Sequence, residues 1–142
     1  MDRVRLVSLD TLGAWLLKCH GGTRPPVRQW CVQPSYRTEL MAAGQPVVFW
    51  VSGDRRRLTP GIWALGELTG PPVLDPPGEH RKLRVPLTLH WLDENARFPR
   101  DALLADDRLA TLEVLRQPQA SNPSFVTKPQ WAALRTLIAA DT

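Results

Sequence analysis

The sequence predicts a strand-dominated α+β domain, built as a curled sheet or small barrel with helices on its outside. Over most of the chain the apolar positions alternate with polar ones, which is typical of strands. In the last third they recur at helical spacing instead. A chain of 142 residues is long enough for one domain and too short for two comfortable ones, and 43% hydrophobic residues suffice for a sizeable core. We therefore expect a single domain over residues 1–142 and exclude wholesale disorder.

Three runs in the first half predict strands. The apolar run Ala14–Lys18 predicts a short buried strand that stops before Gly21 and Gly22. Pro46–Ser52 and Gly61–Leu68 are rich in residues that favour strands. The polar segment between them is typical of a hairpin with a long loop.

The segments between these strands predict loops and one short helix. Pro25-Pro26 opens a loop that runs to Trp30-Cys31-Val32. Tyr36–Ala43 is expected to form a helix, with Gly44 as its C-terminal stop. Pro71–Gly78 contains four prolines, so we expect an excursion and not an interior strand.

The clearest strand pattern lies at Leu83–Trp91, where alternate residues are apolar, and Pro86 predicts an edge or a bulge there. Beyond it the pattern becomes helical. Asp107 is expected to cap a turn that ends at Gln117-Pro118. Thr127 and Gln130 have the spacing of a capping box, which predicts a terminal helix. Its packing stripe is predicted to consist of Trp131, Leu134, Leu137 and Ile138.

The composition favours a mildly basic protein. The 18 Lys and Arg residues exceed the 14 Asp and Glu, giving a net charge of +4, and 15 of the 18 are Arg. Arginine grips phosphate through a planar fork and stacks on bases, so the excess is compatible with nucleic-acid binding. GC-rich coding explains it equally well. Six Trp residues against one Tyr and three Phe are the second unusual feature.

Other protein classes find no support. No apolar run approaches the roughly 20 residues of a membrane-spanning helix, and Met1–Arg5 lacks the features of a signal peptide. We expect a cytoplasmic protein with no membrane partner, in which Cys19 and Cys31 are free thiols.

The sequence lacks the common catalytic signatures: it contains no Gly-rich phosphate loop, paired-His helix or Gly-x-Ser-x-Gly elbow. Cys19, His20 and Cys31, with His80 and His90, lack the paired spacing of zinc ligands, so we expect neither a metal nor a cofactor. A nucleophile pair of Cys31 and His20 would rest on composition alone.

Four segments occur in a recognisable order: Ala14–Lys18, Trp30–Val32, Gly44–Ser52 and Gly61–Leu68. A tail from Pro99 to Leu134 follows them and includes Leu115–Pro118 and Phe125–Thr127. This order resembles the EVE domain family and is similar to the related YTH domains, both of the PUA-like fold. The resemblance covers roughly residues 13–140. It implies a small mixed β-barrel flanked by short helices, with a pocket for a modified, methylated or hydroxymethylated base.

The resemblance also implies roles for individual residues. Trp30 matches the aromatic wall on which the base stacks, and the main chain at Cys31 would bond the base edge. Lys18, Cys19 and His20 would line the other side, while Trp50 and Ser52 lie on the strand whose end forms the floor. YTH domains add cage tryptophans from the loop that corresponds to Pro71–Lys82, which contains none here. A second aromatic wall would therefore require Trp50 or Trp63 to turn inward.

The remaining aromatic and basic residues receive simpler interpretations. Trp15, Trp63, Trp91 and Trp131 lie on apolar faces and are predicted core residues. Phosphate contacts would come from a loop triplet and two further arginines, although a charge run is more often simply solvated. These candidates are Arg28, Arg37, Arg55, Arg56 and Arg57.

The sequence thus predicts a non-enzymatic reader of single-stranded or flipped-base DNA or RNA carrying a modified base. Two alternatives stay open. One is an enzyme of the same fold, an ASCH-type ribonuclease or base-processing enzyme with His20 as general base. The other is a module that binds a small molecule or a partner protein through the same cleft. The nucleic acid, the base and its modification are not specified by the sequence.

Overall fold

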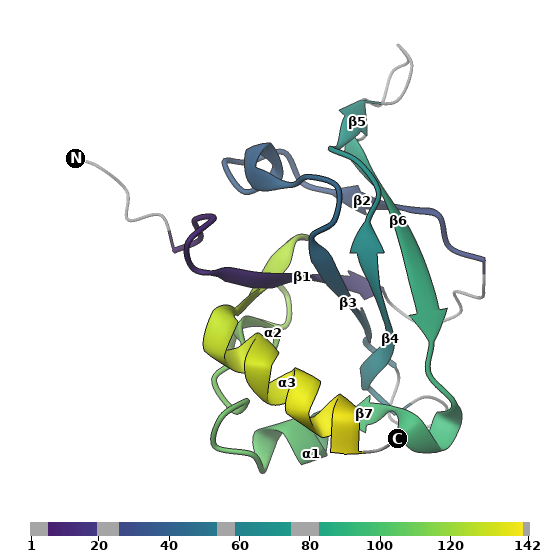
Figure 1. Ribbon diagram of the computed structural model, residues 1–142, viewed down its shortest axis with the longest axis vertical. Coiled ribbons are helices and arrows are strands. Elements are labelled where there is room, and N and C mark those ends of the chain that lie inside the picture. Colours follow the sequence, from purple (N-terminus) through teal and green to yellow (C-terminus); the bar gives the residue numbers. More distant parts are fainter. Residues whose placement is uncertain (1–5, 20–25, 54–58, 75–82, 141–142) are drawn as a thin grey trace.

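The computed structural model describes residues 6–19, 26–53, 59–74 and 83–140. Eight strands and a few short helices form a mixed α+β domain with a curled, half-barrel sheet (Figure 1). The strands are β1 (Leu12–Cys19), β2 (Gln29–Val32), β3 (Pro46–Val51), β4 (Gly61–Leu68), β5 (Val73–Leu74), β6 (Leu83–Trp91), β7 (Phe98–Pro99) and β8 (Ser124–Thr127). The helices are η1 (Thr38–Leu40), η2 (Glu94–Ala96), α1 (Arg100–Leu104), α2 (Glu113–Arg116) and α3 (Lys128–Ala140). The predicted strand-dominated α+β architecture is confirmed.

The sheet runs in the order β2-β6-β4-β3-β1-β8, with β5 paired to β6 and β7 to β4. Its one parallel pair joins β1 and β3, in a register that sets Cys19 beside Val51. The other described pairs are antiparallel. Because β1 and β3 run in the same direction, their last residues, Cys19 and Val51, lie side by side at the same end of the strands.

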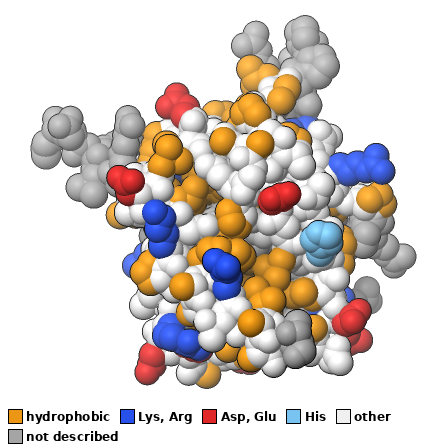
Figure 2. Space-filling model, viewed as in Figure 1, with side chains coloured by type: hydrophobic (Ala, Val, Ile, Leu, Met, Phe, Trp, Pro, Cys, Tyr) orange, Lys and Arg blue, Asp and Glu red, His pale blue; other side chains and the backbone are white. Residues whose placement is uncertain are grey.

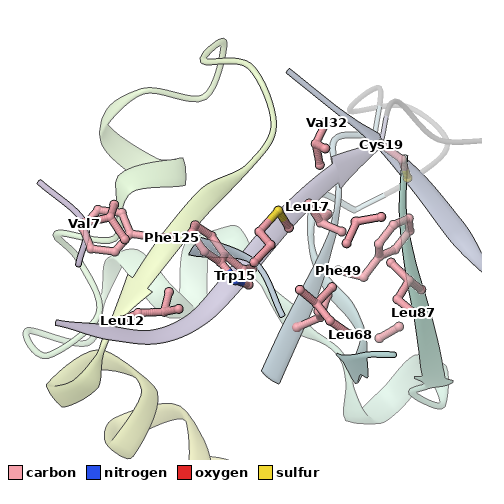
Figure 3. Close-up of a cluster of buried hydrophobic side chains, with 14 of the residues drawn as sticks. Val7, Leu12, Trp15, Leu17, Cys19, Val32, Phe49, Leu68, Leu87 and Phe125 are labelled. Carbon is pink, nitrogen blue, oxygen red and sulfur yellow. The ribbon is translucent and has the colours of Figure 1, made fainter. Parts of the chain in front are cut away.

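The two faces of the sheet bury two separate clusters, as strand alternation requires. The first cluster lies inside the curl (Figure 3) and contains Trp15, Leu17, Cys19, Phe49 and Phe125, among others. The second lies between the other face and the helices, where α3 and α1 cross the sheet (Figure 1). It contains Leu16, Trp50, Leu109, Leu112 and Leu134, among others.

Two local predictions are confirmed. The alternating run Leu83–Trp91 is a strand with the predicted bounds. Thr127 and Gln130 form the predicted reciprocal cap: Thr127 N–H donates to Gln130 Oε1 at 2.9 Å, and Gln130 N–H donates to Thr127 Oγ1 at 3.3 Å.

The predicted helix over Tyr36–Ala43 is wrong, since only the 3₁₀ turn η1 forms there. The side chain of Gln45 takes the backbone groups that a helix would use. Its Nε2 donates to Leu40 O and its Oε1 accepts from Ala42 N–H, both at 2.8 Å. Gly44 nevertheless has the predicted positive φ of 88°.

Two further expectations need correction. Asp106, and not Asp107, accepts a backbone N–H in the turn before α2: its Oδ1 bonds Arg108 N at 2.9 Å. Trp30–Val32 is part of strand β2 and not a loop. The described part of the Pro-rich segment, residues 71–74, contains β5, which pairs with β6 outside the main strand order.

Candidate functional site

Trp30 on β2 has an indole ring held in place by two contacts. Its Nε1–H donates to the carbonyl oxygen of Lys18 on β1 at 3.0 Å. Its ring meets the ring of Phe49 edge to face, with centroids 5.0 Å apart and an interplanar angle of 85°. Trp30 is half-buried, so this fixed ring keeps part of its surface exposed.

Phe49 lies between Trp30 and a second tryptophan, Trp91. The centroids of Phe49 and Trp91 are 5.6 Å apart, with an interplanar angle of 70°. Strand pairing explains the contact, because Ala64 pairs with Phe49 on one side and with Trp91 on the other. Phe49 is fully buried and both tryptophans are half-buried. We call these three rings, with Trp63, the aromatic cluster.

A β-bulge sets the position of Trp63 on β4. The register of β3 and β4 shifts between Phe49 and Trp50, so that Trp63 is the extra residue. A bulge re-aims side chains, and here Trp63 packs with Ala64 against the first core cluster. Its Nε1–H donates to Thr59 O at 3.0 Å, and the guanidinium of Arg97 lies 3.7 Å from its ring centroid. Trp63 and Trp91 thus pack against the core, as predicted, and a second aromatic wall at Trp63 stays a prediction.

The main chain of Cys31 faces away from β6. Leu87 N–H donates to Arg28 O at 3.0 Å, so alternate residues from Arg28 onward bond β6. The residues between them direct their N–H and C=O groups the other way. Gln33 follows this pattern, since its N–H donates to Asn122 O at 2.8 Å. Cys31 itself is exposed.

Lys18 contributes its main chain and not its amine to this region. Its Nζ donates to the carbonyl oxygens of Pro118, at 3.4 Å, and Ala120. Burial lowers the pKa of Lys18, although nearby Glu113 acts in the opposite direction and Arg37 adds to the lowering. The side chain of Asn122 holds the Lys18 main chain, accepting its N–H at 2.9 Å and donating to its C=O at 3.0 Å.

The other predicted pocket residues are divided between the two faces of the sheet. Cys19 is buried in the first cluster with Phe49, and its carbonyl accepts Ser52 N–H at 2.8 Å. Trp50 is 3% exposed and lies in the second cluster, on the helix side. The structure therefore does not bring Trp50 to Trp30, which corrects its assignment to the pocket floor. The reason is alternation along β3, which places Phe49 there instead.

The predicted phosphate ligands also separate. Arg37 forms a two-pronged ion pair with Glu113, at 2.6 and 2.9 Å, and donates to Pro123 O at 3.0 Å. The hydrogen bond to Glu113 raises the pKa of Arg37, and the side chain is 18% exposed. Its charge is neutralised within the fold, so its assignment as a phosphate ligand is corrected. Arg28 is exposed. His20 and the triplet Arg55, Arg56 and Arg57 lie outside the described residues.

Three grooves are lined by described residues. One of about 370 Å³ extends from β2 to the segment before β8 and is lined by Cys31, Val32, Gln33, Pro34, Leu83, Ser121 and Asn122. A smaller one of about 190 Å³ shares Gln33, Ser121 and Asn122 and reaches the Arg37–Glu113 pair. The third, of about 420 Å³, lies on the helix-side face of β4 and β6, lined by Leu65, Gly66, Glu67, Thr88, His90 and Leu92. Hydrophobic side chains gather between the sheet and α3 on the face drawn in Figure 2.

The described residues contain neither a cluster of metal ligands nor a helix that could span a membrane. Within the described ranges, no three His, Cys, Asp or Glu side chains gather as a metal site would require. No helix in that part of the chain is long and apolar enough to cross a membrane.

Sequence reasoning missed two residues of the site, Asn122 and Arg97. Asn122 is 104 residues from its partner Lys18, and no local pattern signals that contact. Arg97 had no feature to separate it from the other arginines.

Comparisons with known proteins match structures and not sequences. No family model and no curated protein matches the chain. The chain is similar to an NMR structure from Rhodopseudomonas palustris, with a TM-score of 0.68, 15% identity and coverage of 91% of this chain and 94% of the other. It is similar to a crystal structure from Pseudomonas putida, with a TM-score of 0.65, 16% identity and coverage of 88% and 99%. It is also similar to a hypothetical protein from Leishmania major, with a TM-score of 0.62, 16% identity and coverage of 92% and 98%. At these identities the likeness shows a shared fold.

Proposed function

We propose that this domain is an EVE-type reader of the PUA-like fold, which binds single-stranded or flipped-base nucleic acid and seats one modified base against Trp30. One observation carries the proposal. Trp30 is fixed by Lys18 and Phe49, remains partly exposed, and stands beside a main chain at Cys31 that points away from β6.

The chemistry of a nucleobase fits these groups. Stacking on one aromatic side chain contributes about 1–3 kcal/mol and tolerates any base. Identity is then read at the base edge, which becomes accessible once the base leaves its stack. Main-chain N–H and C=O groups are suited to this role because the strand fixes their directions. A methyl substituent adds about 0.8 kcal/mol of apolar contact when buried.

The architecture is compatible with this proposal. The curled mixed sheet with outer helices is what the resemblance to EVE domains implies. Trp63 and Trp91 provide aromatic surface beyond Trp30, as a cage around a modified base would need. Trp50 and Arg37 are therefore not part of the proposed site, and Trp30 is its central residue.

The test is a binding titration. Short fluorescent single strands carrying one cytosine, 5-methylcytosine, 5-hydroxymethylcytosine or 6-methyladenine are followed by anisotropy. We expect tighter binding to one modified strand, and at least a tenfold loss in Trp30→Ala, as removal of one stacking contact predicts. Trp131→Phe is the matched control, because Trp131 packs in the second cluster on the other face of the sheet.

Each remaining outcome contradicts the proposal. Equal binding to all strands would indicate a general nucleic-acid binder. If Trp30→Ala binds as tightly as the parent, the base does not stack on Trp30. Cleavage of the strands would favour the enzymatic alternative, and absence of binding would favour a small molecule or partner protein.

A further inference from the structure

Arg97 is held against Trp63, and no carboxylate among the described residues pairs with it. Its guanidinium carbon lies 3.7 Å from the ring centroid, the distance of a stacked contact. Its Nε is buried and has no hydrogen-bond partner among the residues that the structure describes. The side chain as a whole is half-buried. Among the described residues, the ring of Trp63 is therefore what positions the Arg97 side chain.

Two other arginines show the contrast. Arg37 is neutralised by Glu113 at 2.6 Å, and Arg108 by Asp106 at 2.8 Å. Stacking occupies the face of a guanidinium and leaves the N–H donors of its two terminal nitrogens in the plane of the group, clear of the ring. That planar fork matches the oxygens of a phosphate group, and the stacked ring reduces the entropy lost when the fork binds.

The position of Arg97 connects it to the aromatic cluster. Trp63 O accepts Leu92 N–H at 2.9 Å, which sets Trp63 beside the end of β6. The next residue of β4, Ala64, pairs with Trp91. Trp91 in turn contacts Phe49, which contacts Trp30, so a chain of packed rings and paired strands leads from Arg97 to Trp30.

We propose that Arg97, held on Trp63, binds a phosphodiester group of the strand whose base stacks on Trp30. This inference rests on the proposed function and names the phosphate contact of the same site. It assigns that role to a side chain that no carboxylate in the described part of the chain neutralises, in place of Arg37.

The experiment compares Arg97→Gln with Arg135→Gln, which removes the same charge from an exposed position on α3. Binding of the modified single strands is measured between 50 and 300 mM salt. We expect Arg97→Gln to lower affinity about tenfold. It should also reduce the slope of log K against log salt by about 0.7, the value for one phosphate contact in a single strand. Arg135→Gln should change the slope by much less.

A further variant separates binding from folding. Arg97→Lys keeps the charge but loses the planar fork, so we expect it to retain most of the salt slope while binding more weakly than the parent. If Arg97→Gln only lowers the melting temperature and leaves the salt slope equal to that of Arg135→Gln, Arg97 is structural and the inference is overturned. In that case the proposed function still holds if Trp30→Ala loses at least tenfold in affinity. If the parent binds none of the strands, the proposed function and this inference fail together.

Discussion

The side-chain amide of Asn122 occupies the place of a strand neighbour for the main chain of Lys18. Its Oδ1 accepts Lys18 N–H at 2.9 Å and its Nδ2 donates to Lys18 C=O at 3.0 Å. The pairing of β8 with β1 ends at Ser124 and Leu16, so Asn122 continues it one step by side chain. Asn122 also accepts Gln33 N–H, and the same Lys18 carbonyl accepts Trp30. Asn122 thus links β1, through its side-chain amide, to the segment after β2, through its main-chain carbonyl, and it supports the Lys18 carbonyl that positions Trp30.

Replacement of Asn122 by Ala should destabilise the fold by about 1–3 kcal/mol, because the buried Lys18 loses the acceptor of its N–H and one of the two donors to its carbonyl oxygen. Asn122→Asp should cost at least as much, since a carboxylate oxygen would face the Lys18 carbonyl. Urea unfolding measures both effects. Gln119→Ala, an exposed position in the same loop, is the control. Equal midpoints for Asn122→Ala and Gln119→Ala would show that the amide contributes nothing.

The Gln45 side chain should be more important to stability than its half-buried position suggests. It accepts Trp15 Nε1–H at 2.7 Å, and Trp15 is fully buried. Gln45→Leu preserves volume but leaves that N–H without its acceptor, so we expect a loss of about 2 kcal/mol. A double-mutant cycle with Trp15→Phe checks the cause. The loss on Gln45→Leu should be smaller in the Trp15→Phe background, and simple additivity would contradict the pairing.

The Arg37–Glu113 pair should affect stability and not the binding of nucleic acid. Glu113→Gln leaves a largely buried guanidinium without its counter-charge, and we expect a loss of up to about 3 kcal/mol. Arg37→Met combined with Glu113→Leu removes both charges and should recover much of that loss. Thermal unfolding measures both variants. The double variant should bind oligonucleotide with the parent's salt slope, and a reduced slope would restore Arg37 as a phosphate ligand.

Lys18 should make stability rise with pH in the alkaline range. Burial lowers its pKa in the folded state below the ordinary 10.5, which the unfolded chain retains. Between the lowered value and 10.5 the unfolded state binds more protons, so raising pH through that window favours folding. Urea unfolding between pH 7.5 and 10.5 should show this increase in the parent. Lys18→Met should lack that component, and an identical pH profile in both proteins would rule out the effect.

Local patterns accounted for many of the elements. The alternation at Leu83–Trp91 predicted β6 because one face of the strand is buried and the other is not. The capping box at Thr127 and Gln130 was readable because both bonds join residues three apart. The helix expected over Tyr36–Ala43 failed because Gln45, which follows it, bonds the backbone of Leu40 and Ala42. Helix propensity does not account for a side chain outside the segment that bonds the same backbone groups.

The sequence by itself determined the α+β class and the strand runs, because these depend on short-range periodicity and on residue type. The choice of Trp30 came from the resemblance to EVE domains. The tertiary structure decided which face of the sheet each aromatic residue joins. It placed Phe49, and not Trp50, beside Trp30, and the bulge at Trp63 brought that ring to Arg97. It also decided that Arg37 is paired with Glu113 while Arg97 stacks on Trp63. These outcomes depend on strand register and on contacts between residues far apart in the chain, where packing selects the partner and no local pattern specifies it.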